Sequence, residues 1–306
     1  MSFLKRLTDP RPILLDGATG TELNRRAVDT SLPLWSAHAL VAAPEVLRQI
    51  HMDYLRAGAE VITANTFRTH RRSLARGGFG HRALELTAQA VTIARDAVRE
   101  HAAKHSADDH HEHFVAGSLA PLEDCYSPQL APPPEECERE HTEMAEHLAE
   151  AGVDLILVET MNTIREAVAA AKAARATGLP VISSFVCGAD GKLLSGETVT
   201  TAFETVAPLG VVGVCVNCTP STTIEVPFAE LRAAVQLRAG RAMPRIGLYA
   251  NIGHTDAVQG WTITADVSPL EYARLAAAWL KQGASIVGGC CGTTPAHIAA
   301  VRATLG

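Results

Sequence analysis

Two hydrophobic patterns alternate along the chain. Short runs rich in Val, Ile and Leu are separated by longer segments in which apolar residues recur at helical spacing. Runs that are apolar almost throughout are typical of parallel strands, which are buried on both faces. The pattern predicts strands at Ile13–Asp16, Glu60–Ala64, His113–Gly117, Asp154–Glu159, Pro180–Val186, Val211–Asn217, Arg245–Ala250 and Ala284–Gly288.

A helical segment follows every predicted strand. Two of these segments begin with capping-box patterns, Thr163 with Glu166 and Ser268 with Glu271, and Thr294 before a proline is a further N-cap signal. The predicted helices are Pro44–Ala57, Ala83–Lys104, Glu135–Ala151, Ile164–Thr177, Thr200–Ala207, Phe228–Ala239, Pro269–Gln282 and Pro295–Thr304.

Eight strand–helix units in 306 residues predict a closed (β/α)8 barrel of the TIM type. We expect a single domain over residues 1–306, because no segment has the composition of an interdomain linker. The alternative is an open, doubly wound parallel sheet. That fold needs no particular strand number, and the pattern Gly-x-Gly-x-x-Gly does not follow the first predicted strand.

The longest irregular segments all follow predicted strands. In a barrel, such loops lie on the face that carries the active site. The histidine-rich segment His101–His113 includes the end of a predicted helix instead, and we expect it to be a solvated helix end and loop on the opposite face. The loops are Gly17–Ala43, Thr66–Gly80, Leu119–Pro134, Gly188–Val199 and Ile252–Val267.

Composition narrows the class of protein. Hydrophobic residues make up 47% of the chain, enough for one large core, and the formal net charge of −6 argues against a nucleic-acid-binding protein. No run of about 18 apolar residues predicts a membrane span, and the N-terminus lacks the apolar region of a signal peptide.

Seven cysteines without a secretion signal predict reduced thiols in the cytoplasm. The expected partners are small molecules, and no pattern specifies an oligomeric state.

Three cysteines stand out as candidate metal ligands. Cys290 and Cys291 are adjacent in a glycine-rich segment that ends the last predicted strand, and Cys218 closes the sixth. Adjacent strand residues point to opposite faces, so both thiols can converge only where the chain leaves strand geometry, which flanking glycines permit. Three thiolates leave one tetrahedral position of Zn²⁺ open, as in catalytic zinc sites. We expect Cys215 to be a core residue, and we assign no role to the remaining cysteines, Cys125, Cys137 and Cys187.

Acidic and amide side chains end other predicted strands. They are Asp16, Asn65, Glu159, Asn217 and Asn251. Because the carboxyl ends of barrel strands meet at one rim, these groups suit an amino-acid ligand. An acid binds its ammonium group, and amides bind its carboxylate.

Four motifs in this order resemble the zinc-dependent homocysteine S-methyltransferase family. They are Asp-Gly-Ala-Thr-Gly-Thr-Glu-Leu from Asp16, Ala-Asn-Thr-Phe from Ala64, Val-Asn-Cys from Val216, and Gly-Gly-Cys-Cys-Gly-Thr-Thr-Pro from Gly288. The resemblance runs from about Ile13 to the C-terminus. It implies a barrel fold, zinc ligation by Cys218, Cys290 and Cys291, and contacts from Asp16 and Glu159 to the homocysteine amino group.

The same resemblance implies a reaction. Zinc binds the homocysteine thiol as its fourth ligand and deprotonates it, and the sulfur attacks the methyl group of a sulfonium donor, S-methylmethionine or S-adenosylmethionine. No protein side chain is needed as a covalent nucleophile. Ala250 and His254 stand where many relatives have Pro and Glu, which leaves the donor less defined than the acceptor. Trp35 and Tyr126, in predicted loops, are candidates either for donor binding or for packing.

Two other functions remain open from the residues alone. The Gly288-Gly289 turn before the last helix also fits a phosphate-binding barrel lyase or isomerase, although phosphate binding does not explain the cysteines. A zinc- or redox-sensing thiol protein without catalytic turnover is the other alternative.

Overall fold

Eight parallel strands form a barrel in the computed structural model, which describes residues 2–104, 112–238, 243–256, 260–262 and 266–305. The strands are β1 (Ile13–Leu14), β2 (Val61–Ala64), β3 (Phe114–Leu119), β4 (Leu155–Met161), β5 (Val181–Phe185), β6 (Gly213–Pro220), β7 (Arg245–Asn251) and β10 (Ile286–Gly289). They pair in the order β1-β10-β7-β6-β5-β4-β3-β2.

The two edges of this sheet meet through β1 and β2. Leu15 forms a parallel bridge with Val61, the Glu60 amide donates to the Leu14 carbonyl at 2.8 Å, and the Asp16 amide donates to the Val61 carbonyl at 3.0 Å. These contacts close the barrel. The predicted (β/α)8 fold is confirmed, and the open-sheet alternative is wrong.

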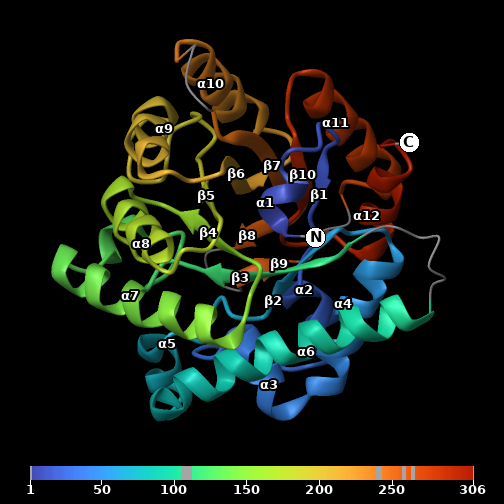
Figure 1. The fold of residues 1–306 in the computed structure, drawn as a ribbon, viewed down its shortest axis with the longest axis vertical. Coiled ribbons are helices and arrows are strands. Elements are labelled where there is room, and N and C mark those ends of the chain that lie inside the picture. Colours follow the sequence, from blue (N-terminus) through green and yellow to red (C-terminus); the bar gives the residue numbers. More distant parts are fainter. Residues whose placement is uncertain (1, 105–111, 239–242, 257–259, 263–265, 306) are drawn as a thin grey trace.

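One long helix follows each barrel strand, and Figure 1 shows these helices around the outside of the strands. They are α4 (Pro44–Arg56), α6 (Ala83–Lys104), α7 (Pro134–Ala151), α8 (Ile164–Ala176), α9 (Val199–Val206), α10 (Glu225–Gln236), α11 (Pro269–Lys281) and α12 (Pro295–Arg302). Ser268 and Glu271 form the predicted capping box of α11. At α8 only half of the box forms, because the Glu166 carboxylate accepts from the Leu122 amide at 2.8 Å instead.

Several shorter elements were not predicted. They are α1 (Phe3–Arg6), α2 (Gly20–Arg25), α3 (His38–Ala42), α5 (Arg71–Arg76), the antiparallel pair β8 (His254–Asp256) and β9 (Gly260–Thr262), and the 3₁₀ turns Trp35–Ala37, Gly80–Arg82, Pro128–Leu130 and Ala207–Leu209. Apart from α1 and Ala207–Leu209, they lie in the loops that follow β1, β2, β3 and β7. These loops are built around the C-terminal ends of the strands.

The barrel interior follows from the alternation of side chains along each strand. The inward positions form one buried apolar cluster, which includes Cys215, predicted as a core residue. Phe3 of α1 belongs to the same cluster and packs edge-on against Phe114 with ring centroids 5.2 Å apart. The cluster contains Phe3, Ile13, Leu15, Val61, Phe114, Ala116, Leu155, Leu157, Ile182, Cys215, Tyr249 and Ile286.

The next inward position on several strands is polar. Two residues beyond Val61, Ala116, Leu157, Ile182 and Cys215, the sequence places Thr63, Ser118, Glu159, Ser184 and Asn217. These side chains therefore form a polar layer above the apolar one, at the C-terminal end of the barrel.

The histidine-rich segment is only partly described, since residues 105–111 lie outside the described residues. Its first residue, His101, is buried rather than solvated, and its ring packs edge-on against His113 at 5.0 Å between centroids. Among the helices that the structure describes, none is long and apolar enough to span a bilayer.

Candidate metal centre and substrate cavity

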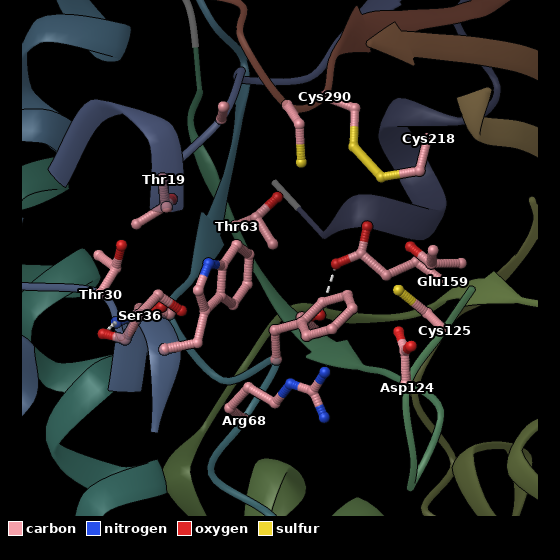
Figure 2. Close-up of a pocket in the computed structure, with 18 of the residues that line it drawn as sticks. Thr19, Thr30, Ser36, Thr63, Arg68, Asp124, Cys125, Glu159, Cys218 and Cys290 are labelled. Carbon is pink, nitrogen blue, oxygen red and sulfur yellow. Dashed lines mark hydrogen bonds between the residues drawn. A yellow bond between two sulfur atoms is a disulfide. The ribbon is translucent and has the colours of Figure 1, made fainter. Parts of the chain in front are cut away.

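Three cysteine side chains meet at the C-terminal end of the barrel. The sulfur atoms of Cys218, Cys290 and Cys291 all lie within 4.8 Å of one another. Cys218 and Cys290 are joined by a disulfide, which Figure 2 shows at the edge of the cavity. Cys218 and Cys291 are 7% and 8% exposed. The structure thus brings together the three residues that the sequence singled out.

The turn after β10 brings the adjacent cysteines to this point. The strand ends at Gly289, where a Cβ atom would lie 2.3 Å from Thr293 Oγ1. Gly292 adopts a φ of +85°, which side chains disfavour. The Cys290 amide donates to the carbonyl of Ala250 in β7 at 2.8 Å. As predicted, glycines let the chain leave strand geometry at the cysteines.

Cys218 is presented by an irregularity in β6. The strand continues to Pro220 rather than ending at Asn217, and its register against β7 shifts between these two residues. Within the shift, Cys218 has a φ of +47°. The Asn251 side chain donates to the Cys218 carbonyl at 2.8 Å and holds the backbone in this conformation.

Asn217 connects two irregular strands. Its side-chain carbonyl accepts from the Thr160 amide at 3.0 Å and from Ser184 Oγ at 2.7 Å, and its amide group donates to Thr160 Oγ1 at 2.8 Å. Thr160 has a φ of +60° at the register shift in β4, which runs on to Met161 rather than ending at Glu159. Asn217 and Asn251 are not among the residues that line the cavity, so their contact with substrate stays a prediction.

Two buried carboxyl groups line the same cavity as the cysteines. Asp16 accepts hydrogen bonds from the Thr63 amide at 2.8 Å and from Thr63 Oγ1 at 2.9 Å. Glu159 accepts one from Ser118 Oγ (Figure 2). Burial raises the pKa of each carboxyl to about 7, and the nearby Glu159 adds a smaller upward effect on the pKa of Asp16. A cationic ligand between them would favour their charged forms.

The cavity has a volume of about 1210 Å³. Asp16, Asn65 and Glu159 line it together with the three cysteines. The Asn65 side-chain amide donates to the Ser36 carbonyl at 2.8 Å, which fixes its orientation.

Other lining residues were not predicted from the sequence. They include Thr63, Ser118, Arg68, Asp124 and Cys125, to which no role had been assigned. The inward alternation of β2 and β3 could have identified Thr63 and Ser118, whereas no local signal marks the loop residues. Trp35 and Tyr126 also line the cavity, and Trp35 packs edge-on against Phe67 with centroids 5.5 Å apart.

The donor chemistry of the cysteine cluster fits a soft metal ion. Reduction of the Cys218–Cys290 disulfide yields two thiol groups, which make three together with the free thiol of Cys291. Thiolates prefer zinc or copper(I) to magnesium or calcium. All three cysteines line the cavity, so a further ligand can reach the same point from the cavity.

Comparisons with known proteins agree along the whole chain. Residues 13–305 match the homocysteine S-methyltransferase family. The chain is 32% identical over 313 residues to "Homocysteine S-methyltransferase 2" of Zea mays, covering 96% of this chain and 89% of that protein. It is 32% identical over 317 residues to "Homocysteine S-methyltransferase" of Escherichia coli, covering 98% and 97%. The crystal structure of the homocysteine methyltransferase MmuM from Escherichia coli, metallated form, aligns with a TM-score of 0.81 and 27% identity over 98% of both chains.

Proposed function

The chain belongs to the homocysteine S-methyltransferase family, and we propose that it transfers a methyl group to the thiol of L-homocysteine, giving methionine. The observation that carries this proposal is the convergence of three cysteine sulfurs on a cavity that also holds two buried acids. A thiol acceptor can bind a metal at the cysteines while its amino group reaches the acids.

The metal we propose is Zn²⁺, held by Cys218, Cys290 and Cys291. Three cysteine thiolates with an open fourth position are typical of a catalytic rather than a structural zinc site. When bound, Zn²⁺ supplies the Lewis acidity that keeps the acceptor thiol deprotonated near neutral pH. The cysteines contribute three negative charges, which keep sulfur at the site electron-rich.

Asp16 and Glu159 bind the ammonium group of homocysteine in this proposal. Their hydrogen bonds to Thr63 and Ser118 fix both carboxyl groups at the cavity wall. Because both acids are buried, their charged forms gain most when a cation lies between them. This contact sets the position of the acceptor sulfur relative to the cysteines.

The methyl donor in this proposal is a sulfonium compound, S-methylmethionine or S-adenosylmethionine. The homocysteine sulfur attacks the methyl carbon, the bond from that carbon to the donor sulfur breaks, and the donor leaves as a neutral thioether. The electron pair of the broken bond stays on the donor sulfur, so no oxidant or covalent enzyme intermediate is required. The protein's part is to align the two sulfur atoms on either side of the methyl group.

A donor panel tests the proposal. Reduced, zinc-loaded protein is incubated with homocysteine and with S-methylmethionine, S-adenosylmethionine or betaine in turn, and methionine is quantified. We expect turnover with at least one sulfonium donor and its loss after chelation. Zinc binding without methionine formation from any donor would favour a zinc- or redox-sensing thiol protein, and phosphate binding without zinc would favour a lyase or isomerase.

A further inference from the structure

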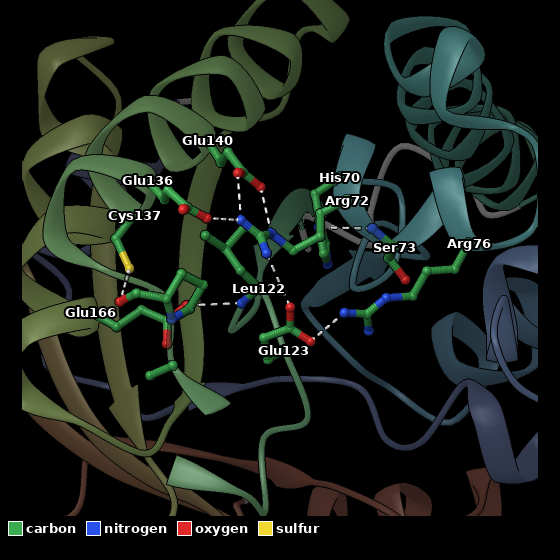
Figure 3. Close-up of polar contacts among 12 residues, drawn as sticks. His70, Arg72, Ser73, Arg76, Leu122, Glu123, Glu136, Cys137, Glu140 and Glu166 are labelled. Carbon is green, nitrogen blue, oxygen red and sulfur yellow. Dashed lines mark hydrogen bonds and ion pairs between the residues drawn. The ribbon is translucent and has the colours of Figure 1, made fainter. Parts of the chain in front are cut away.

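Four arginines lie close together on the segment after β2, and three of them are paired. Figure 3 shows Arg72 among carboxylates of α7 and of the loop that precedes α7, and it shows Arg76, which lies on α5 like Arg72, beside Glu123 of that loop. The pairs are Arg71 with Glu143, Arg72 with Glu123, Glu136 and Glu140, and Arg76 with Glu123. These ion pairs fasten α5 to α7 and to the loop between β3 and α7.

The fourth arginine, Arg68, has no carboxylate partner among the residues that the structure describes. It is half-buried and lines the cavity. Its Nε atom is buried without a hydrogen-bond partner, and Nη1 makes one long contact of 3.5 Å to the Glu123 carbonyl. The guanidinium lies 5.7 Å from the Phe67 ring centroid. A planar guanidinium held in a cavity with unused donors is suited to bind a carboxylate.

An unpaired acid faces the same part of the cavity. Asp124 lies on the loop after β3, accepts from the Tyr126 amide at 3.1 Å and from Ser127 Oγ at 2.8 Å, and has no basic partner within the described part of the chain. Asn162 donates to the Cys125 carbonyl of this loop at 3.0 Å, which fixes the backbone beside Asp124. Figure 2 shows Arg68 and Asp124 across the cavity from the Cys218–Cys290 disulfide.

We propose that Arg68 and Asp124 form a subsite for the amino-acid end of the methyl donor, with Arg68 binding its α-carboxylate and Asp124 its α-ammonium group. This inference rests on the proposed function. Two unpaired groups of opposite charge at separate points of one cavity match a zwitterion. The acceptor occupies the cysteine side with Asp16 and Glu159, and a cavity of about 1210 Å³ leaves room for a second molecule.

The test measures separately how the α-carboxylate and the α-ammonium group of the donor contribute to binding. S-methyl-L-methionine and its methyl ester, which lacks the carboxylate, are titrated calorimetrically into zinc-loaded protein without homocysteine, so that no methyl transfer occurs. In Arg68→Gln, the Kd of S-methyl-L-methionine should rise about 10- to 100-fold, while the Kd of the ester should not change, because a charge-assisted hydrogen bond is lost only for the carboxylate. In Asp124→Asn, both ligands should bind more weakly.

Steady-state kinetics give a second readout. Arg68→Gln should raise the KM for S-methyl-L-methionine and leave the KM for homocysteine unchanged. Arg68→Lys should recover part of the binding, because lysine keeps the charge but lacks the planar, two-pronged guanidinium group.

The matched control is Arg76→Gln, which removes a cavity-lining guanidinium that is already paired with Glu123. Its effect on donor binding should be less than about threefold, in line with a partly exposed ion pair.

Several results would overturn this subsite. One is equal affinity of the wild-type protein for S-methyl-L-methionine and its ester. Another is a higher KM for homocysteine in Arg68→Gln with donor binding unchanged, which would assign Arg68 to the acceptor. If the wild-type protein binds S-methyl-L-methionine through Arg68 but methylates homocysteine from no donor, the proposed function fails while the subsite stands.

Discussion

Asp16 and Glu159 show how single residues gain a role from their surroundings. Each is an ordinary acid in sequence, and each becomes a buried carboxyl group at the wall of a cavity, 3% and 8% exposed. Burial raises the pKa of both to about 7, so their charge depends on what binds beside them.

Replacing Glu159 by Gln should weaken homocysteine binding while leaving the metal content unchanged. Loss of a charged hydrogen-bond partner for the ammonium group predicts a rise in KM of about 10- to 100-fold. A simple thiol acceptor without an amino group serves as the control, and its KM should rise much less. Equal losses for both acceptors would mean that Glu159 acts through the packing of the barrel end.

The raised pKa of Glu159 also predicts a pH-dependent stability in protein without metal or substrate. The folded state binds this proton more tightly than the unfolded state, so the contribution of Glu159 to stability falls as the pH rises toward its folded pKa of about 7. Glu159→Gln removes the effect. Between about pH 5 and about pH 8, the free energy of unfolding of the variant should increase relative to that of the wild type by on the order of 1 kcal/mol per pH unit. Urea unfolding at several pH values measures both free energies. A difference between variant and wild type that stays the same at every pH would contradict this prediction.

At the scale of elements, the C-terminal ends of the barrel strands determine where the side chains of the site lie. The eight helices that follow the barrel strands were predicted, and the bounds of α6 match those expected from the sequence. The ends of β4 and β6 were placed too early, because each strand continues through a register shift at a non-glycine residue with positive φ, Thr160 or Cys218. Asn217 and Asn251 hold these conformations through contacts between strands, and no local sequence signal reports them.

The loop residues of the cavity were missed for a related reason. The backbone that carries Arg68 and Asp124 is held by ion pairs of α5 with α7 and with the loop after β3, and by the hydrogen bond from Asn162, which follows β4, to that loop. These partners are far apart in the sequence. The cysteines and acids could be predicted because strand ends in a closed barrel must meet at one rim.

Gly289→Ala tests the turn that presents the adjacent cysteines. A Cβ atom at Gly289 would collide with Thr293 Oγ1, so the turn must shift and metal affinity should fall by at least about tenfold, the equivalent of 1.4 kcal/mol. Zinc titration against a chelating indicator measures this loss. The matched control is Gly188→Ala, where the nearest atom is the flexible Asp190 side chain at 3.1 Å and no cysteine ligand is close in sequence. An unchanged zinc affinity in Gly289→Ala would show that the turn tolerates the shift.

At the scale of the whole molecule, folding and metal binding are separable. The barrel core is built from apolar strand and helix residues, and the cysteine cluster lies at its C-terminal end. Zinc fingers, by contrast, lack such a core and unfold without their metal. The protein should therefore keep its fold when the site is empty.

Cys290→Ala tests this separation. We expect loss of tight zinc binding and of methyl transfer together, with an unchanged far-ultraviolet circular dichroism spectrum. Unfolding should remain cooperative, with a modest loss of stability because metal binding no longer favours the folded state. An unfolded chain would show that the zinc is structural, and retained zinc with retained turnover would show that Cys290 is not a ligand.

The most direct measurement is the X-ray absorption spectrum of the metal in reduced, zinc-loaded protein, recorded with and without homocysteine. The metal edge identifies the ion, and the fine structure counts its sulfur neighbours. Three cysteine ligands with an open position predict three sulfur neighbours in the free protein and four when homocysteine is bound. A sulfur count that does not change on adding saturating homocysteine would contradict activation of the acceptor thiol by the metal.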